Sequence, residues 1–80
     1  MSGDTRSVGT IIRERREAHG LSPEELAKRA FITPIVLYNI EEDLEERPPA
    51  SALFYLAKEL ELDYHELLAR GGHFMKHKPD

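Results

Sequence analysis

The stretch that decides the fold is GLSPEELAKRAFITPIVLYNIE, residues 20–41. Within it, Ser22 is followed by a proline, and Glu25 stands three residues after Ser22, which is the spacing of a helix-capping box. Thr33 and Pro34 repeat the order of hydroxyl and then proline, so a second helix is expected to begin there. The stretch therefore predicts two short helices joined by a few residues.

Amphipathic helices are also expected on both sides of this pair, because apolar residues recur at three- and four-residue steps. A first helix is expected over about residues 8–19, a fourth over about residues 51–61, and a fifth after Asp63 as its cap. The acidic segment 41–49 is expected to be a loop. No strand-like alternation is present, so the predicted fold class is all-α, with five helices and a central helix-turn-helix motif.

The apolar positions that face inward in these helices predict one common core. Its expected members are Ile12, Leu21, Leu26, Ala27, Ile32, Leu37, Ile40, Leu53, Leu56, Leu60, Leu62 and Leu67.

Length and composition indicate one compact domain. The chain has 80 residues, 40% of them hydrophobic and 32% charged. We expect an N-terminal arm over residues 1–7, a folded domain over residues 8–70 and a flexible tail over residues 71–80. The N-terminus lacks the apolar run of a signal peptide, and no apolar stretch reaches the roughly 20 residues of a membrane span, so no membrane association and a cytoplasmic location are expected.

The charge is unevenly distributed. The formal net charge is −4, but residues 1–30 carry six basic groups against five acids, whereas residues 31–80 carry five against ten. Only the N-terminal part is therefore expected to present a basic face to a nucleic acid.

An enzyme is not expected. The sequence has no cysteine, which excludes disulfides and thiolate metal sites, and its four histidines are scattered. We expect no pocket that would assemble catalytic groups in so small a chain, and we expect no metal and no cofactor.

The stretch over residues 8–68 contains a set of short motifs at consistent spacing. They are Ile12-Arg13, Arg16, Gly20-Leu21-Ser22, Leu26-Ala27, Thr33, Ile40-Glu41, Pro49, Leu56-Ala57 and Leu67-Leu68. With these motifs the chain resembles the Cro/C1-type helix-turn-helix family, also called the XRE family of transcriptional regulators. The resemblance implies a lambda-repressor-like fold, a salt bridge between Arg16 and Glu41, and sequence-specific binding of double-stranded DNA, with a homodimer on paired half-sites.

The resemblance also implies a binding site, with the third helix in the major groove. The residues expected to face the bases are Thr33, Pro34, Ile35, Tyr38 and Asn39, and those expected to bind phosphates are Arg13, Lys28 and Arg29.

Several residues depart from the family pattern. The loop after the third helix carries Glu41, Glu42, Asp43, Glu45 and Glu46, and carboxylates there would repel phosphate.

Two single residues depart as well. Pro23 stands where the family often has a phosphate-binding glutamine. Phe31 stands where a glycine is common, so either the turn is reshaped or Phe31 makes a contact.

A second function therefore stays open beside DNA binding. The scaffold would serve protein–protein interaction, as an adaptor or antirepressor. Its contact surface would be Ile35, Val36, Tyr38 and the acidic loop.

Overall fold

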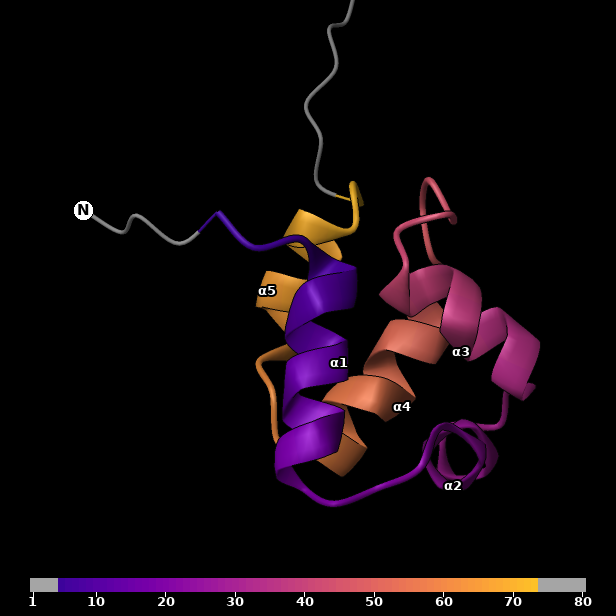
Figure 1. Ribbon diagram of the computed structural model, residues 1–80. Coiled ribbons are helices and arrows are strands. Elements are labelled where there is room, and N and C mark those ends of the chain that lie inside the picture. Colours follow the sequence, from indigo (N-terminus) through magenta and orange to yellow (C-terminus); the bar gives the residue numbers. More distant parts are fainter. Residues whose placement is uncertain (1–4, 74–80) are drawn as a thin grey trace, which may run out of the picture.

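The computed structural model describes residues 5–73 and contains five helices and no strand within that range. The helices are α1 (Val8–Ala18), α2 (Pro23–Arg29), α3 (Pro34–Glu41), α4 (Ala50–Leu60) and α5 (Tyr64–Arg70) (Figure 1). The predicted all-α fold with five helices is confirmed.

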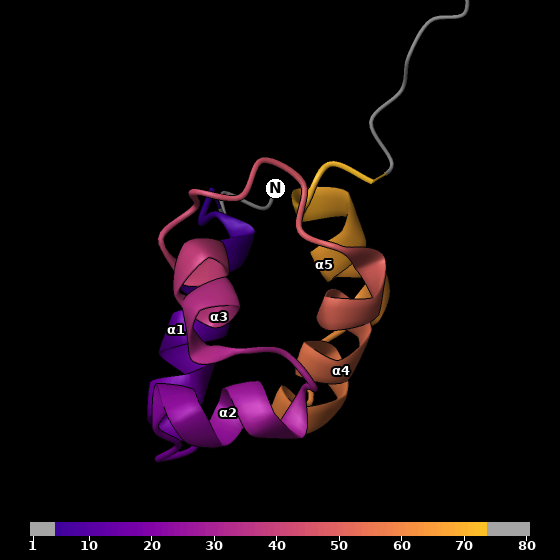
Figure 2. The ribbon, with the colours of Figure 1, turned by 90° about the vertical axis from the view of Figure 1, so that its right-hand side faces the viewer.

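The helices surround one core. α1 packs against α3 and α4, α2 packs against α3 and α4, and α4 packs against α5. Figure 2 shows α2 crossing the base, with α1 and α3 on one side and α4 and α5 on the other. The loop between α3 and α4 runs across the opposite end (Figure 2). This arrangement leaves one side of α3 facing away from the other helices.

The helix starts form where the local sequence predicts them. The Glu25 backbone N–H donates to Ser22 Oγ at 3.0 Å and the Ser22 N–H donates to Glu25 Oε1 at 2.9 Å, so the capping box of α2 is complete. This hydrogen bond from the Ser22 backbone lowers the pKa of Glu25. At α3, Thr33 Oγ1 accepts from the Val36 N–H at 3.1 Å.

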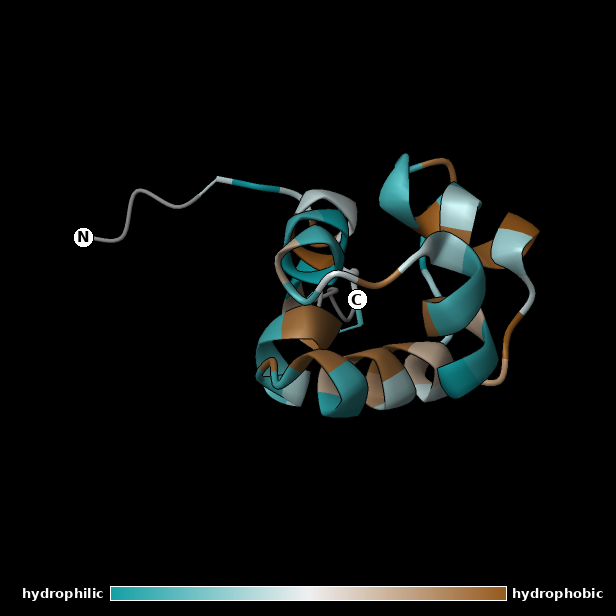
Figure 3. Cartoon of the chain, turned by 60° about the horizontal axis from the view of Figure 1, so that its bottom comes forward, coloured by the Kyte–Doolittle hydropathy of each residue, from teal (hydrophilic) through white to brown (hydrophobic). Residues whose placement is uncertain are grey.

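Most of the expected core is buried. Nine of the twelve predicted residues have at most 1% of their surface exposed. The remaining three, Leu21, Ile32 and Leu62, are only partly buried, because each lies in a link between helices and covers the edge of the core. The helices carry both hydrophobic and hydrophilic residues, as amphipathic helices do (Figure 3).

Residues next to the predicted domain bounds also contact the fold. The Gly71 N–H donates to the Leu67 carbonyl at 2.8 Å, and His73 Nε2 lies 2.6 Å from the Pro48 carbonyl oxygen. Ser7, placed in the arm, caps α1 by accepting from the Thr10 N–H. Residues 1–4 of the arm and 74–80 of the tail lie outside the described range.

α1 and α3 approach closely at Gly9. A Cβ atom there would lie 2.7 Å from the carbonyl oxygen of Glu41 and still closer to that of Ile40. The Gly9 N–H donates to Asp43 Oδ1 at 3.3 Å, and the Ser7 hydroxyl donates to Asp43 Oδ2 at 2.7 Å. The end of α3 is therefore held against the start of α1 through backbone that tolerates no side chain at residue 9.

We expect Gly9→Ala to destabilise the fold by about 1–3 kcal/mol, because the added methyl group forces the two helices apart. In an uncrowded helix the same substitution would stabilise by about 0.5–1 kcal/mol. Urea denaturation followed by circular dichroism shows whether the free energy of unfolding falls or rises in the variant. A variant more stable than the parent would contradict the close contact between α1 and α3.

Among residues 5–73, no helix combines the length and the hydrophobicity needed to cross a membrane.

Candidate nucleic-acid interface

The outward side of α3 carries most of the residues that were expected to face bases. Ile35 is 72% exposed and Tyr38 is 58% exposed, one turn apart on the same side of the helix. Pro34 and Thr33 are also exposed at its start, whereas Asn39 is only half-exposed. The opposite side of α3 is buried in the core. The structure thus brings these residues together on one surface, with Asn39 at its margin.

This surface has little capacity for hydrogen bonding. Thr33 Oγ1 already accepts from the backbone of α3, which leaves its hydroxyl hydrogen as a donor. Pro34 and Ile35 have no polar side-chain atom, so the Tyr38 hydroxyl and the Asn39 amide supply the other polar groups. The exposed part of α3 is mainly apolar.

The three expected phosphate-binding residues differ in their surroundings. Arg13 Nη1 lies 3.0 Å from Glu42 Oε2, and Arg29 Nη1 lies 3.7 Å from Glu59 Oε1. Lys28 is exposed on α2. Sequence reasoning did not anticipate these two ion pairs, because each joins residues about thirty positions apart in the chain.

A buried ion pair sets the position of α3. Arg16 Nε donates to Glu41 Oε2 at 2.8 Å and Nη2 donates to Oε1 at 3.1 Å, with 11% and 7% of the two side chains exposed. Arg16 Nη1 also donates to the Leu21 carbonyl at 3.1 Å. The hydrogen bonds to Glu41 raise the pKa of Arg16, so the guanidinium stays protonated. The salt bridge implied by the resemblance is present, and it ties α1 to the end of α3.

The turn between α2 and α3 keeps the left-handed backbone despite its bulky residue. Phe31 has a φ of 61° and is 76% exposed. Its ring lies edge-on to that of Tyr55, with the centroids 4.9 Å apart. Of the two alternatives for Phe31, the structure shows the contact and not a reshaped turn. The edge-on contact offsets part of the cost of positive φ at a non-glycine residue.

The acidic segment is not a uniform patch, and its first residue, Glu41, belongs to α3 and not to the expected loop. Glu41 is in the buried pair, Glu42 faces Arg13, and Asp43 holds the start of α1 with a φ of 58°. Glu45 and Glu46 are exposed on the loop. Three of the five carboxylates therefore have structural partners, and the surface charge of the loop comes mainly from the last two.

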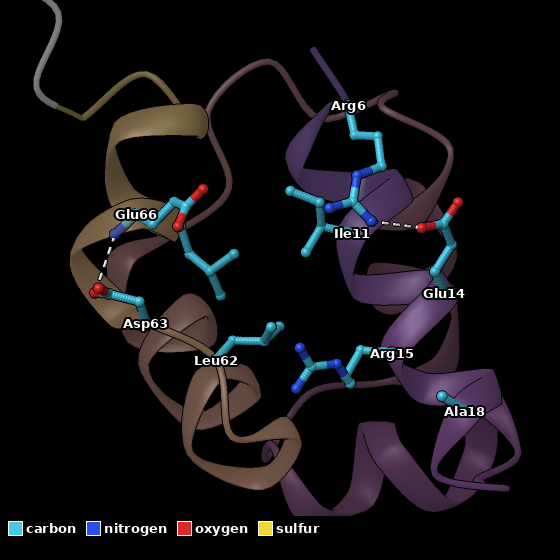
Figure 4. A pocket seen from close by; sticks show the side chains of 9 residues that line it. Arg6, Ile11, Glu14, Arg15, Ala18, Leu62, Asp63 and Glu66 are labelled. Carbon is cyan, nitrogen blue, oxygen red and sulfur yellow. Dashed lines mark hydrogen bonds and ion pairs between the residues drawn. The ribbon is translucent and has the colours of Figure 1, made fainter. Parts of the chain in front are cut away.

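A groove of about 390 Å³ lies between α1 and α5 (Figure 4). Ile11, Leu62 and Leu67 are among the apolar residues that line it, and an ion pair of 2.7 Å between Arg6 and Glu14 lies at its side. The sequence did not predict this groove, which lies between two helices that make few contacts with each other. None of the predicted DNA-contacting residues lines this groove. Over residues 5–73, no cluster of three side chains has the composition of a metal site.

Two short capped helices, α2 and α3, joined by a tight turn, with the second of them exposed on its outer side, have the layout of a helix-turn-helix motif. The chain belongs to the helix-turn-helix family whose sequence model matches residues 12–67. The expected membership of the Cro/C1-type, or XRE, group is confirmed.

Three solved structures of SinR are similar to this chain, each with 31% identity over 76% of its length. The N-terminal DNA-binding domain of SinR from Bacillus subtilis has a TM-score of 0.70 with 88% of that chain covered. The crystal structure of SinR, the master regulator for biofilm formation, in complex with DNA has a TM-score of 0.69, and 97% of that chain is covered. A complex of SinR with the SinI protein has a TM-score of 0.71 with 59% covered. Comparison with proteins of curated function finds no significant match.

Proposed function

We propose that this chain is a transcriptional regulator that binds double-stranded DNA with α3 in the major groove. The observation that carries the proposal is the exposed outward side of α3. It is supported by a sequence identity of 31% to SinR in a structure that contains DNA. The chain would act in the cytoplasm, by binding and without catalysis. DNA binding takes precedence over the protein-scaffold alternative, because both the family and the similar structures are DNA-binding regulators.

In this proposal, Thr33, Pro34, Ile35, Tyr38 and Asn39 face the base edges. Lys28, Arg29 and Arg13 hold phosphates. Exposed ion pairs contribute less than about 1 kcal/mol, so the two arginines exchange their carboxylate partners for phosphate at small cost.

A homodimer and a protein partner are further parts of the proposal. Two copies on half-sites one helical turn apart, about 34 Å, would each place α3 in the major groove. The complex of SinR with SinI supports the idea that a chain of this fold also takes a protein partner. The surface proposed for such a partner is Ile35, Val36, Tyr38 and the exposed part of the acidic loop.

Exchanging Glu45 and Glu46 for lysine tests the proposed function. If α3 enters the groove, the loop that follows it lies near phosphate, and each new contact adds up to about one unit to the slope of log affinity against log salt. We expect tighter binding to duplex DNA and a steeper slope, measured by fluorescence anisotropy at several salt concentrations. Glu61→Lys makes the same change of charge at one residue, half that of the double variant, at the end of α4 and is expected to leave the slope unaltered.

Two outcomes would count against the proposal. Equal slopes for the parent and the double variant would remove the loop from the DNA interface. Binding to no duplex even at low salt would contradict DNA binding itself.

A further inference from the structure

We propose that α3 recognises thymine through its C5-methyl group, with Ile35 as the main specificity-determining residue. The proposal rests on the DNA-binding function proposed above and specifies the base that the site reads.

Ile35 is exposed without a packing role in the described fold. It is 72% exposed at the second position of α3, while Leu37 and Ile40 of the same helix are buried in the core. Exposing a large aliphatic side chain to water is unfavourable, by about 25 cal/mol per Å² of apolar surface. Its position on the outward side of α3 directs that apolar surface toward whatever α3 binds.

The neighbours of Ile35 extend the same surface. Pro34 precedes it and is exposed, and Tyr38 follows one turn later with 58% exposure. The polar groups lie at the margins, since Thr33 caps the helix and Asn39 is half-buried. At Pro34 and Ile35 the surface therefore offers van der Waals contact and no side-chain hydrogen bond, and the Tyr38 hydroxyl is the polar group one turn away.

Such a surface distinguishes thymine from the other bases in the major groove. Thymine alone carries a methyl group there, beside its O4 acceptor, whereas adenine, guanine and cytosine present only amino groups, N7 or O6 as contact groups. Those polar groups would lose water against Ile35 without gaining a partner, which disfavours them. Contact between Ile35 and the methyl group favours thymine. This contact and the unfavourable loss of water by the other bases therefore select the same base.

Replacing thymine by uracil in the DNA isolates this contact, since uracil differs only by the missing methyl group. The preferred duplex is first selected from random sequences with the parent protein, and each of its thymines is then replaced singly by uracil. We expect about a fourfold loss of affinity at the position that faces Ile35, corresponding to the burial of one carbon, and little change elsewhere.

Protein variants assign the effect to this side chain. Ile35→Ala is expected to bind with nearly equal affinity to the thymine and uracil duplexes, and its circular dichroism should match the parent because the residue is exposed. Leu44→Ala removes an aliphatic side chain that is 66% exposed on the loop, and it is expected to keep the fourfold difference.

The outcomes separate this inference from the proposed function. Sequence-specific binding that is indifferent to uracil at every thymine overturns the inference and leaves DNA binding intact. A uracil effect that persists in Ile35→Ala overturns the assignment to Ile35. Binding without any sequence preference also overturns the inference, whereas binding to no duplex at all overturns the proposed function as well.

Discussion

Glu41→Ala is expected to lower the free energy of unfolding by about 3–5 kcal/mol. The substitution leaves the Arg16 guanidinium buried without its carboxylate partner, with only the Leu21 carbonyl still within hydrogen-bonding distance. At about 0.05–0.15 kcal/mol per residue, a domain of 80 residues has a stability of about 4–12 kcal/mol, so the variant should lose a large share of it. Urea denaturation followed by circular dichroism gives the difference directly.

Glu42→Ala is the matched control. It breaks the ion pair with Arg13 one residue further along, where both side chains are exposed, and should cost less than about 1 kcal/mol. The double replacement Arg16→Met with Glu41→Leu should recover much of the stability, because an apolar pair avoids burying charge. Similar losses for Glu41→Ala and Glu42→Ala would contradict a special role for the buried pair.

Leu56→Ala is expected to cost about 2–5 kcal/mol. Leu56 has no exposed surface and lies in the core where α4 packs against α1, α2 and α5. Truncation removes apolar contacts and leaves a cavity that rigid neighbouring helices fill only in part. Thermal and urea unfolding of the purified variant measure the loss.

The same Leu44→Ala substitution serves as the control for Leu56. It removes identical atoms from an exposed position, so its effect should stay within about 0.5 kcal/mol. Equal effects of the two substitutions would mean that α4 does not contribute Leu56 to the core.

The positions on the fold of the residues proposed for the site were predictable from the sequence, whereas their ion pairs were not. The residues on the outward side of α3 follow from the start of the helix at Pro34 and from the resemblance to a known family. The partners of Arg13 and Arg29 did not follow, because Glu42 and Glu59 reach them only through the packing of separate helices. The sequence also does not show that Glu41, Glu42 and Asp43, which follow one another in the acidic segment, have different partners in the fold.

The sequence by itself determined the five helices and most of the core. Caps such as Ser22 and Thr33 act within three residues, and the spacing of apolar residues needs only the geometry of a helix. These are local interactions, so they can be read along the chain.

Only the tertiary structure decided what holds the binding helix in place. Gly9 is required because the carbonyl groups of α3 pass next to it, and Asp43 is engaged because it meets the start of α1. Phe31 keeps a left-handed backbone while its ring lies against Tyr55. Each of these contacts joins residues more than twenty positions apart, and its free energy depends on distances that exist only after the helices have packed.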